Sequence, residues 1–174
     1  MKEIAITEAW RRKYPEWIVL VTSIDQNGRP NVMPAGWSMF TSLKPLLYAV
    51  SIAPERYTHG LIEESGEFVV AIPSVGMGSA IYYCGTHSGR DVEKFENCSL
   101  EPTPATEVKP PLIKGAVANL ECRVVSSLET GDHTIFVGEV VAAHAEEGAG
   151  CRLLNFGDNR YAQPQMVPDT LFCP

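Results

Sequence analysis

The sequence predicts a mainly β protein in which a largely antiparallel sheet closes, or nearly closes, into a barrel with a few short flanking helices. Three observations predict this fold. Short runs of β-branched and apolar residues recur along the chain, brief turn signals separate most of them, and two longer runs near the end flank a four-residue turn. Because short turns join antiparallel neighbours, we expect few parallel pairs.

The first half of the chain predicts several strands and one helix. Trp17 to Ile24 is β-branched and apolar, and the Asn27-Gly28 pair that follows is a strong hairpin signal. The other elements expected here are an extended segment over 30–40, a strand over 46–52 stopped by Pro54, a short helix over 59–66 capped by Thr58 and closed by Gly66, and a strand over 67–72.

The second half predicts one more helix and a long hairpin. The helix covers about Met77 to Tyr83, and the segment from Glu96 to Pro111 contains four prolines, which indicates a surface connection. The hairpin consists of strands over 115–128 and 133–144, joined by a turn over 129–132. The tail after Gly148 is expected to be irregular.

Length, composition and charge restrict the class of protein. We expect a single domain over residues 1–174, with its core at about 17–147, because 45% of the residues are hydrophobic and 20% are charged. A net charge of −7 argues against nucleic acid or an anionic membrane as a partner. The N-terminus shows no apolar run of signal-peptide length, so we expect a cytoplasmic protein.

The cysteines are odd in number and scattered, with no CxxC pair, which favours reduced thiols over a disulfide framework. The five are Cys84, Cys98, Cys122, Cys151 and Cys173.

The stretch YYCGTHSGRDVEKF, from Tyr82 to Phe95, combines residue types that allow three kinds of site. As a metal site it is weak, because Cys84 and His87 lack the tight paired spacing of four zinc ligands. As a nucleophile, Cys84 has basic neighbours that lower a thiol pKa, but no oxyanion hole is evident. A structural Cys84 behind a turn is favoured, since no resolving cysteine is near in sequence.

Anion binding is the third interpretation of this stretch, and a second cluster around Arg56 supports it. Arg56 precedes the predicted helix start at Tyr57 and Thr58, and helix N-termini attract phosphates. A second basic arm would come from four residues of the stretch, Ser88, Gly89, Arg90 and Lys94. Solvated surface charges remain the alternative.

The segment NVMPAGWSMF breaks the alternation of a regular strand with small residues and a proline. Small residues let a flat ligand approach the backbone, whereas an edge strand with a bulge would show the same pattern. The residues concerned are Met33, Pro34, Ala35, Gly36 and Trp37.

These pieces occur in an order that resembles the flavoredoxin branch of the flavin reductase-like, FMN-binding split-barrel family. The resemblance rests on NVMPAGW, SIAPERYT, CGTHSGRDVEKF and GDHTIFVGEV, which together span about Val19 to Val141. It implies a six-stranded antiparallel split barrel of Greek-key type and a homodimer with FMN near the subunit interface. Leu171 and Phe172, apolar residues of the tail, are expected to add to the dimer surface.

The resemblance also implies residue roles. Met33 to Trp37 would line the isoalloxazine, and Ser51 would lie near the ring or the ribityl chain. Arg56 and Thr58 would hold the phosphate beside Tyr57, while Ser88, Gly89, Arg90 and Lys94 would wrap the anionic end. Cys84 and Gly85 would turn the chain, and His133 would stand near the reactive face as the catalytic residue.

The expected function is therefore that of an FMN-dependent oxidoreductase without a metal. NADH, NADPH or a redox protein are the candidate electron donors, and a small molecule or a protein partner is the acceptor. A non-enzymatic FMN electron carrier is the alternative. The chain contains no GxGxxG nicotinamide motif, and the residues do not separate these two functions.

Overall fold

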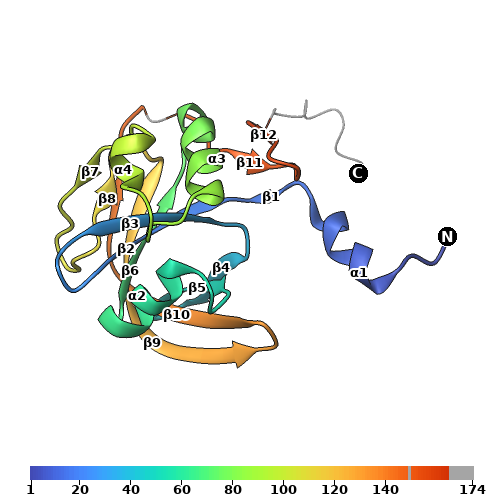
Figure 1. The fold of residues 1–174 in the computed structure, drawn as a ribbon, viewed down its shortest axis with the longest axis horizontal. Coiled ribbons are helices and arrows are strands. Elements are labelled where there is room, and N and C mark those ends of the chain that lie inside the picture. Colours follow the sequence, from blue (N-terminus) through green and yellow to red (C-terminus); the bar gives the residue numbers. More distant parts are fainter. Residues whose placement is uncertain (149, 165–174) are drawn as a thin grey trace.

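A seven-stranded sheet forms the body of the computed structural model, which describes residues 1–148 and 150–164 (Figure 1). Its strands are β2 (Val19–Ile24), β3 (Pro30–Ala35), β4 (Ser38–Leu43), β5 (Leu46–Ile52), β6 (Glu67–Ile72), β9 (Ala118–Thr130) and β10 (His133–Ala145). They follow the order β3-β2-β6-β9-β10-β5-β4, and every neighbouring pair is antiparallel. The predicted antiparallel β class is confirmed, but the main sheet has seven strands rather than the expected six.

The difference in strand count arises at residues 30–40, predicted as one extended segment. The structure divides it into β3 and β4, which lie at opposite ends of the sheet order although only Gly36 and Trp37 separate them. The amide of Ser51 donates to the carbonyl of Trp37 at 2.9 Å, so this crossing is held against β5. The two edges of the sheet therefore come together at the Gly36-Trp37 connection.

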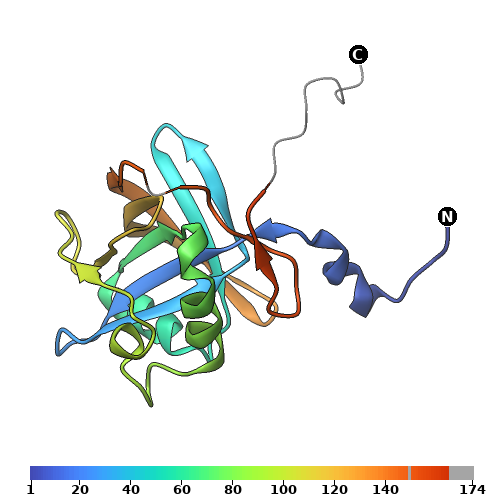
Figure 2. The same cartoon turned by 90° about the horizontal axis from the view of Figure 1, so that it is seen from above.

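Short strands outside the main sheet form two small sheets, and the first of these pairs an N-terminal segment of the chain with a C-terminal one. They are β1 (Glu16–Trp17), β11 (Leu154–Asn155) and β12 (Tyr161–Ala162) in one small sheet, and β7 (Pro102–Thr103) with β8 (Leu112–Ile113) in another. The prediction of an irregular tail is wrong for the part that pairs with β1 (Figure 2). Leu171 and Phe172 lie outside the described residues.

The helices are short and lie around the sheet. They are α1 (Ile6–Ala9), α2 (Tyr57–Ser65), α3 (Gly78–Thr86) and α4 (Lys94–Asn97), with 3-10 turns η1 (Trp10–Lys13) and η2 (Val75–Met77). Helix α1 sits on an N-terminal arm that extends away from the sheet (Figures 1 and 2). Across the described parts of the chain, no helix has both the length and the apolar character needed to cross a membrane.

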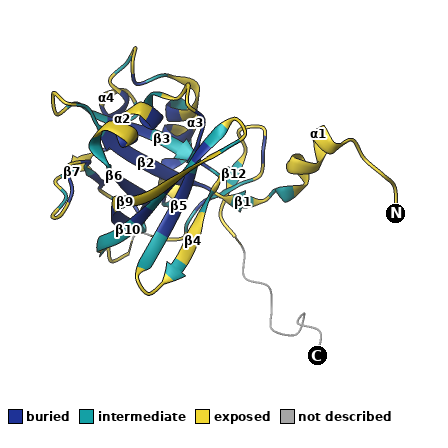
Figure 3. Cartoon of the chain, turned by 90° about the horizontal axis from the view of Figure 1, so that it is seen from below, coloured by how far each residue is buried: buried dark blue, intermediate teal, exposed yellow. Residues whose placement is uncertain are grey.

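Two layers of core cover the two faces of β2, which explains why its sequence is a continuous apolar run. Val19 and Val21 pack with Phe68 and Phe136 within the curve of the sheet. Leu20, on the opposite face, belongs to a second cluster formed with α3 and α4. The buried residues of Figure 3 follow this arrangement, while β4 remains largely exposed.

Helix α2 begins one residue earlier than its predicted cap. Arg56 is the N-cap in extended conformation, no side chain caps the helix, and Thr58 is buried within the first turn. The end is as predicted, because Gly66 adopts φ 67°, a left-handed conformation that glycine accepts without strain. Because no side chain caps α2, the amide groups of Tyr57 and Thr58 in its first turn have no helix partner and are free for a ligand.

Helix α3 is longer than predicted and includes Cys84 and Gly85 in its final turn. These two residues do not turn the chain, as the sequence suggested; the helix ends at Thr86, and His87 returns to extended backbone. The motif that follows folds back on Ser88, whose carbonyl accepts from the amides of Asp91 and Val92 at 3.1 and 3.2 Å.

Candidate functional site

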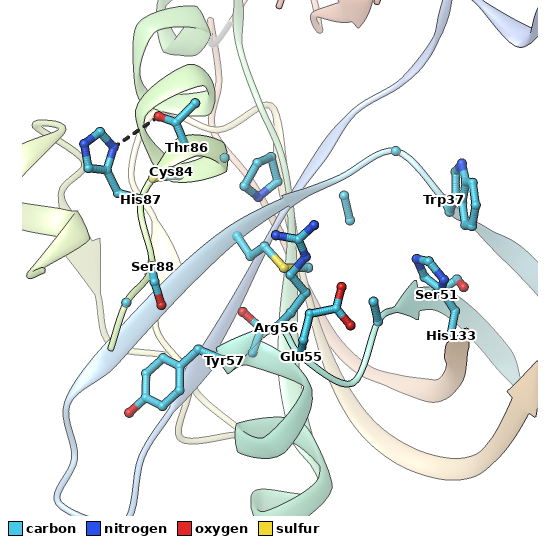
Figure 4. A pocket seen from close by; sticks show the side chains of 18 of the residues that line it. Trp37, Ser51, Glu55, Arg56, Tyr57, Cys84, Thr86, His87, Ser88 and His133 are labelled. Carbon is cyan, nitrogen blue, oxygen red and sulfur yellow. Dashed lines mark hydrogen bonds between the residues drawn. The ribbon is translucent and has the colours of Figure 1, made fainter. Parts of the chain in front are cut away.

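A cavity of about 580 Å³ opens where the two edges of the sheet come together. All fourteen residues proposed from the sequence line it, from Met33 in β3 to His133 at the start of β10. Figure 4 shows Trp37, Ser51 and His133 on one side of this cavity and Tyr57 with Ser88 on the other. Segments that are far apart in the sequence therefore meet at one site.

The first end of the cavity is cationic and rich in hydrogen-bond donors. The uncapped start of α2 faces it, together with the exposed side chains of Arg56 and Arg90. Arg90 is fixed by a bond from Nη1 to the carbonyl of Glu55 at 3.0 Å and by its position over the ring of Tyr57. In a chain of net charge −7, this concentration of donors and positive charge favours an anion.

Lys94 is buried at the same end, only 5% exposed, between β3 and α3. Its Nζ donates to the carbonyl of Val32 at 2.9 Å and to that of Cys84 at 2.8 Å. An ammonium has three donors, so one remains for a ligand. Burial lowers the pKa of Lys94 from its ordinary value, which shows that its charge is poorly hydrated.

Asn31 supports this end through contacts with Thr58 and Ser23, a role that no sequence motif predicted. Its Nδ2 donates to Thr58 Oγ1 at 2.9 Å and to Ser23 Oγ at 3.1 Å, which orients the hydroxyl of Thr58. Its Oδ1 is buried without a partner among the described residues, and it lies against Gly89. A Cβ on Gly89 would sit 2.1 Å from this oxygen, so any larger residue would force the loop or the Asn31 side chain to shift.

The second end of the cavity is aromatic. The rings of Trp37 and His133 lie 4.7 Å apart at an angle of 39°, and His133 Nδ1 bonds Asp132 Oδ1 at 2.7 Å. The carboxylate can only accept, so Nδ1 carries the proton and Nε2 is left for another partner. The bond from His133 holds the pKa of Asp132 below its ordinary value.

The N-terminal arm supplies a wall that sequence reasoning missed. Trp10, Lys13, Tyr14 and Glu16 line the cavity, and the ammonium of Lys13 stands 5.2 Å from the centre of the Trp37 ring. Glu16 pairs with Lys13 and accepts from Asn155, which ties the arm to β11. No local pattern predicts this wall, because it forms only when the small sheet of β1, β11 and β12 is assembled.

Six further lining residues lie within the predicted motifs SIAPERYT and CGTHSGRDVEKF but were given no ligand contact there. They are Ala53, Glu55, Cys84, Gly85, Thr86 and His87. His87 stacks on Tyr83 and bonds Thr86, so its ring is held at the rim of the cavity (Figure 4).

Residues 10–165 match the family model described as the flavin reductase like domain. The chain belongs to the flavin reductase-like family. The resemblance predicted from four short motifs is thereby confirmed over most of the chain.

Two curated relatives illustrate the range of the flavin reductase-like family. An uncharacterised protein of Archaeoglobus fulgidus is 50% identical over 113 residues, which are 65% of this chain and 64% of that protein. The chain thus spans slightly less than two thirds of this relative. An NADH-dependent FAD reductase of Streptomyces globisporus is 32% identical over 135 residues, covering 76% of this chain and 73% of the relative.

Solved structures of the family share the whole fold. An FMN-binding protein of Thermus thermophilus, with bound p-hydroxybenzaldehyde, matches with a TM-score of 0.86 and 30% identity, covering 97% of this chain and 100% of the other. A flavoredoxin of Methanosarcina acetivorans matches with a TM-score of 0.84 and 32% identity, covering 96% and 94%.

Proposed function

We propose that the chain is a flavin-dependent oxidoreductase that binds FMN in the cavity between the sheet edges. The observation that carries this proposal is the pairing of a cationic end with an aromatic end in one cavity of about 580 Å³. FMN has the matching parts, a phosphate dianion joined by a flexible chain to a flat ring. Similarity to an FMN-binding protein supports the choice of cofactor.

The residues fit FMN in a definite orientation. The phosphate would meet the free N–H groups at the start of α2, the guanidinium of Arg56 and the hydroxyl of Thr58. Ser88, Gly89 and Arg90 would close over it, and Lys94 would add its remaining donor. Ser51 would lie beside the ribityl chain.

The ring would lie along the Met33–Trp37 segment, where Ala35 and Gly36 carry small or no side chains and leave backbone groups accessible. When bound, FMN supplies hydride and one-electron transfer. The protein supplies position: Trp37 bounds the ring site, and Nε2 of His133 is directed to contact a donor or to hold a proton beside the ring.

The electron donor distinguishes two versions of this function. Similarity to an NADH-dependent FAD reductase favours a reductase that accepts hydride from NADH or NADPH. Similarity to a flavoredoxin favours the second candidate, an electron carrier that keeps FMN bound and exchanges electrons with a protein. We propose the reductase, because Trp37 and His133 line the cavity together and provide an aromatic pair that a nicotinamide ring can contact.

We also propose a homodimer. Met39, Phe40 and Leu43 on the edge strand β4 are exposed, as are Val125 and Leu128 on the outer part of β9. An exposed edge strand with apolar side chains is prone to pair with another chain. A second copy of this chain can bury the same surface through a symmetric interface.

The test mixes purified protein with NADH or NADPH, with and without added FMN, and follows the near-ultraviolet absorbance of the reduced nicotinamide. Rapid FMN-dependent oxidation supports the reductase. Reduction of bound flavin by a reduced electron-transfer protein, with no response to either nicotinamide, would instead support the carrier.

A further inference from the structure

Cys84 and Cys98, fourteen residues apart in the sequence, meet in the folded protein. Their sulfur atoms lie 3.5 Å apart, Cys84 at the end of α3 and Cys98 directly after α4. The two short helices pack side by side on β3 and share one apolar cluster (Figure 1). The expectation of a purely structural Cys84 rested on the absence of a resolving cysteine, and the fold supplies one.

Both cysteines are bonded to Lys94. The carbonyl of Cys84 accepts from Lys94 Nζ at 2.8 Å, and the thiol of Cys98, when neutral, donates to the backbone carbonyl of Lys94 at 2.7 Å. Lys94 itself lines the proposed FMN cavity. The chain between the two cysteines also contains Ser88, Gly89 and Arg90, so a covalent link would enclose these residues and Lys94 in one loop.

The two thiols have different environments. Cys84 is 1% exposed, whereas Cys98 is half-buried and so is the one that a small molecule can reach. The hydrogen bond from Cys84 lowers the pKa of Cys98 to about 7, and the same bond with burial raises that of Cys84. Cys98 is therefore suited to act as the nucleophile and Cys84 as the resolving thiol.

We propose that Cys84 and Cys98 form a redox couple that a hydroperoxide oxidises to a disulfide, and that this disulfide weakens FMN binding through Lys94. In the first step the Cys98 thiolate attacks the hydroperoxide: an S–O bond forms, the O–O bond breaks, and an alcohol or water leaves after taking up a proton. In the second step the Cys84 sulfur attacks Cys98: the S–S bond forms, the S–O bond breaks, and hydroxide leaves as water with the Cys84 proton. The two thiols lose two electrons and the hydroperoxide gains them.

The direction of the effect on FMN follows from the geometry around Lys94. A disulfide S–S bond is about 2.05 Å long, so the sulfurs must approach each other and α4 must shift toward α3. The thiol that donates to the Lys94 carbonyl is lost. Lys94 is the first residue of α4, so this shift moves its ammonium from the position in which it lines the cavity and weakens its contact with a phosphate. This consequence rests on the proposed function, whereas disulfide formation does not.

The test uses full-length protein, reduced and then freed of reductant, with and without a short exposure to hydrogen peroxide. Peptide mapping reports the thiols, and fluorescence titration with FMN, after removal of peroxide, reports affinity. We expect a Cys84–Cys98 disulfide and FMN affinity reduced by at least ~5-fold, the lower range of coupled equilibria, with both reversed by dithiothreitol. Cys98→Ser should abolish both responses, and the control Cys151→Ser, at an exposed cysteine outside the pair, should keep both.

Two results would overturn the proposal. One is treatment with peroxide that leaves Cys84 and Cys98 as thiols, or that oxidises each of them separately to a sulfur acid without forming a disulfide. The other is an effect on FMN that does not depend on the disulfide. This would be seen if the disulfide formed while FMN affinity stayed unchanged, or if peroxide lowered the FMN affinity of Cys98→Ser as much as that of the wild-type protein. Failure of the reduced protein to bind FMN at all would refute the proposed function, and the peptide map would still decide whether the couple exists.

Discussion

The indole of Trp37 lies against the imidazole of His133, with ring centroids 4.7 Å apart. Trp37 comes from the connection between the two edge strands, and His133 is the first residue of β10 after a tight turn. Asp132 holds the imidazole from the other side at 2.7 Å. The fold thus fixes a proton-bearing side chain beside the proposed ring site.

The first prediction concerns the role of His133. Substituting His133→Ala should leave FMN affinity within a few-fold, because the phosphate end is untouched, but should slow flavin reduction by ~10-fold or more, the low end for a lost orienting or acid–base group. Stopped-flow reduction of bound flavin measures this. Asp132→Asn, which keeps the imidazole but removes the carboxylate, should have a smaller effect. Reduction of the alanine variant at the wild-type rate would make His133 a bystander.

The second prediction concerns the close contact at Gly89. Gly89→Ala should weaken FMN by ~10-fold or more, because its Cβ would lie 2.1 Å from Asn31 Oδ1 and the loop over the phosphate would have to move. Gly60→Ala is the matched control, since a Cβ at Gly60 in α2 meets nothing within 4 Å. Fluorescence titration of both variants decides it, and equal affinities would show that the loop does not cover the ligand.

The sequence predicted the residues that line the cavity better than the scaffold around it. Arg56, Gly89 and His133 lie in short motifs that carry the family resemblance, and the fold brings these motifs together. The wall formed by Trp10 and Lys13 was not predicted, because it depends on pairing between β1 and β11, which carries no local signal. The break at Gly36-Trp37 was missed for a similar reason: only the joining of two sheet edges shows that one extended segment is two strands.

The third prediction concerns acid stability through Glu121, which is fully buried in β9. Burial raises its pKa, but bonds from the amides of Thr106 and Glu107 and from His144 outweigh burial and lower it to about 2. Because the folded pKa lies below the unfolded one of about 4.3, Glu121 stabilises the protein above that pH, and this stability is lost as pH falls toward about 2.

Glu121→Gln should therefore cost about 2–4 kcal/mol of unfolding free energy at neutral pH, since an amide cannot accept all of these bonds. The difference in unfolding free energy between this variant and the wild-type protein should become smaller as pH falls from about 4.3 toward about 2. Urea denaturation at neutral and acid pH measures both values, with Glu129→Gln, at an exposed position of the same strand, as the control. A difference in unfolding free energy that does not change with pH would contradict a lowered pKa for the Glu121 carboxylate in the folded protein.

The fourth prediction concerns assembly. Light scattering should give the mass of a dimer, and Leu43→Glu on the edge of β4 should shift the equilibrium toward monomer, because a buried unpaired charge is costly at an interface. Thr103→Glu, placed on the separate small sheet, serves as the control. A monomeric wild type at micromolar concentration with FMN bound would refute the dimer.

The most direct test of the central claim is calorimetric titration of the protein with FMN and, separately, with riboflavin, which lacks the phosphate. We expect one FMN per chain and clearly weaker riboflavin binding. Arg56→Ala should reduce FMN affinity by ~10-fold or more, the worth of a charge-assisted contact, and leave riboflavin unchanged. Arg123→Ala, an arginine paired with Glu107 away from the cavity, should change neither. Equal affinity for FMN and riboflavin in the wild-type protein would contradict the phosphate site at the start of α2 and the function built on it.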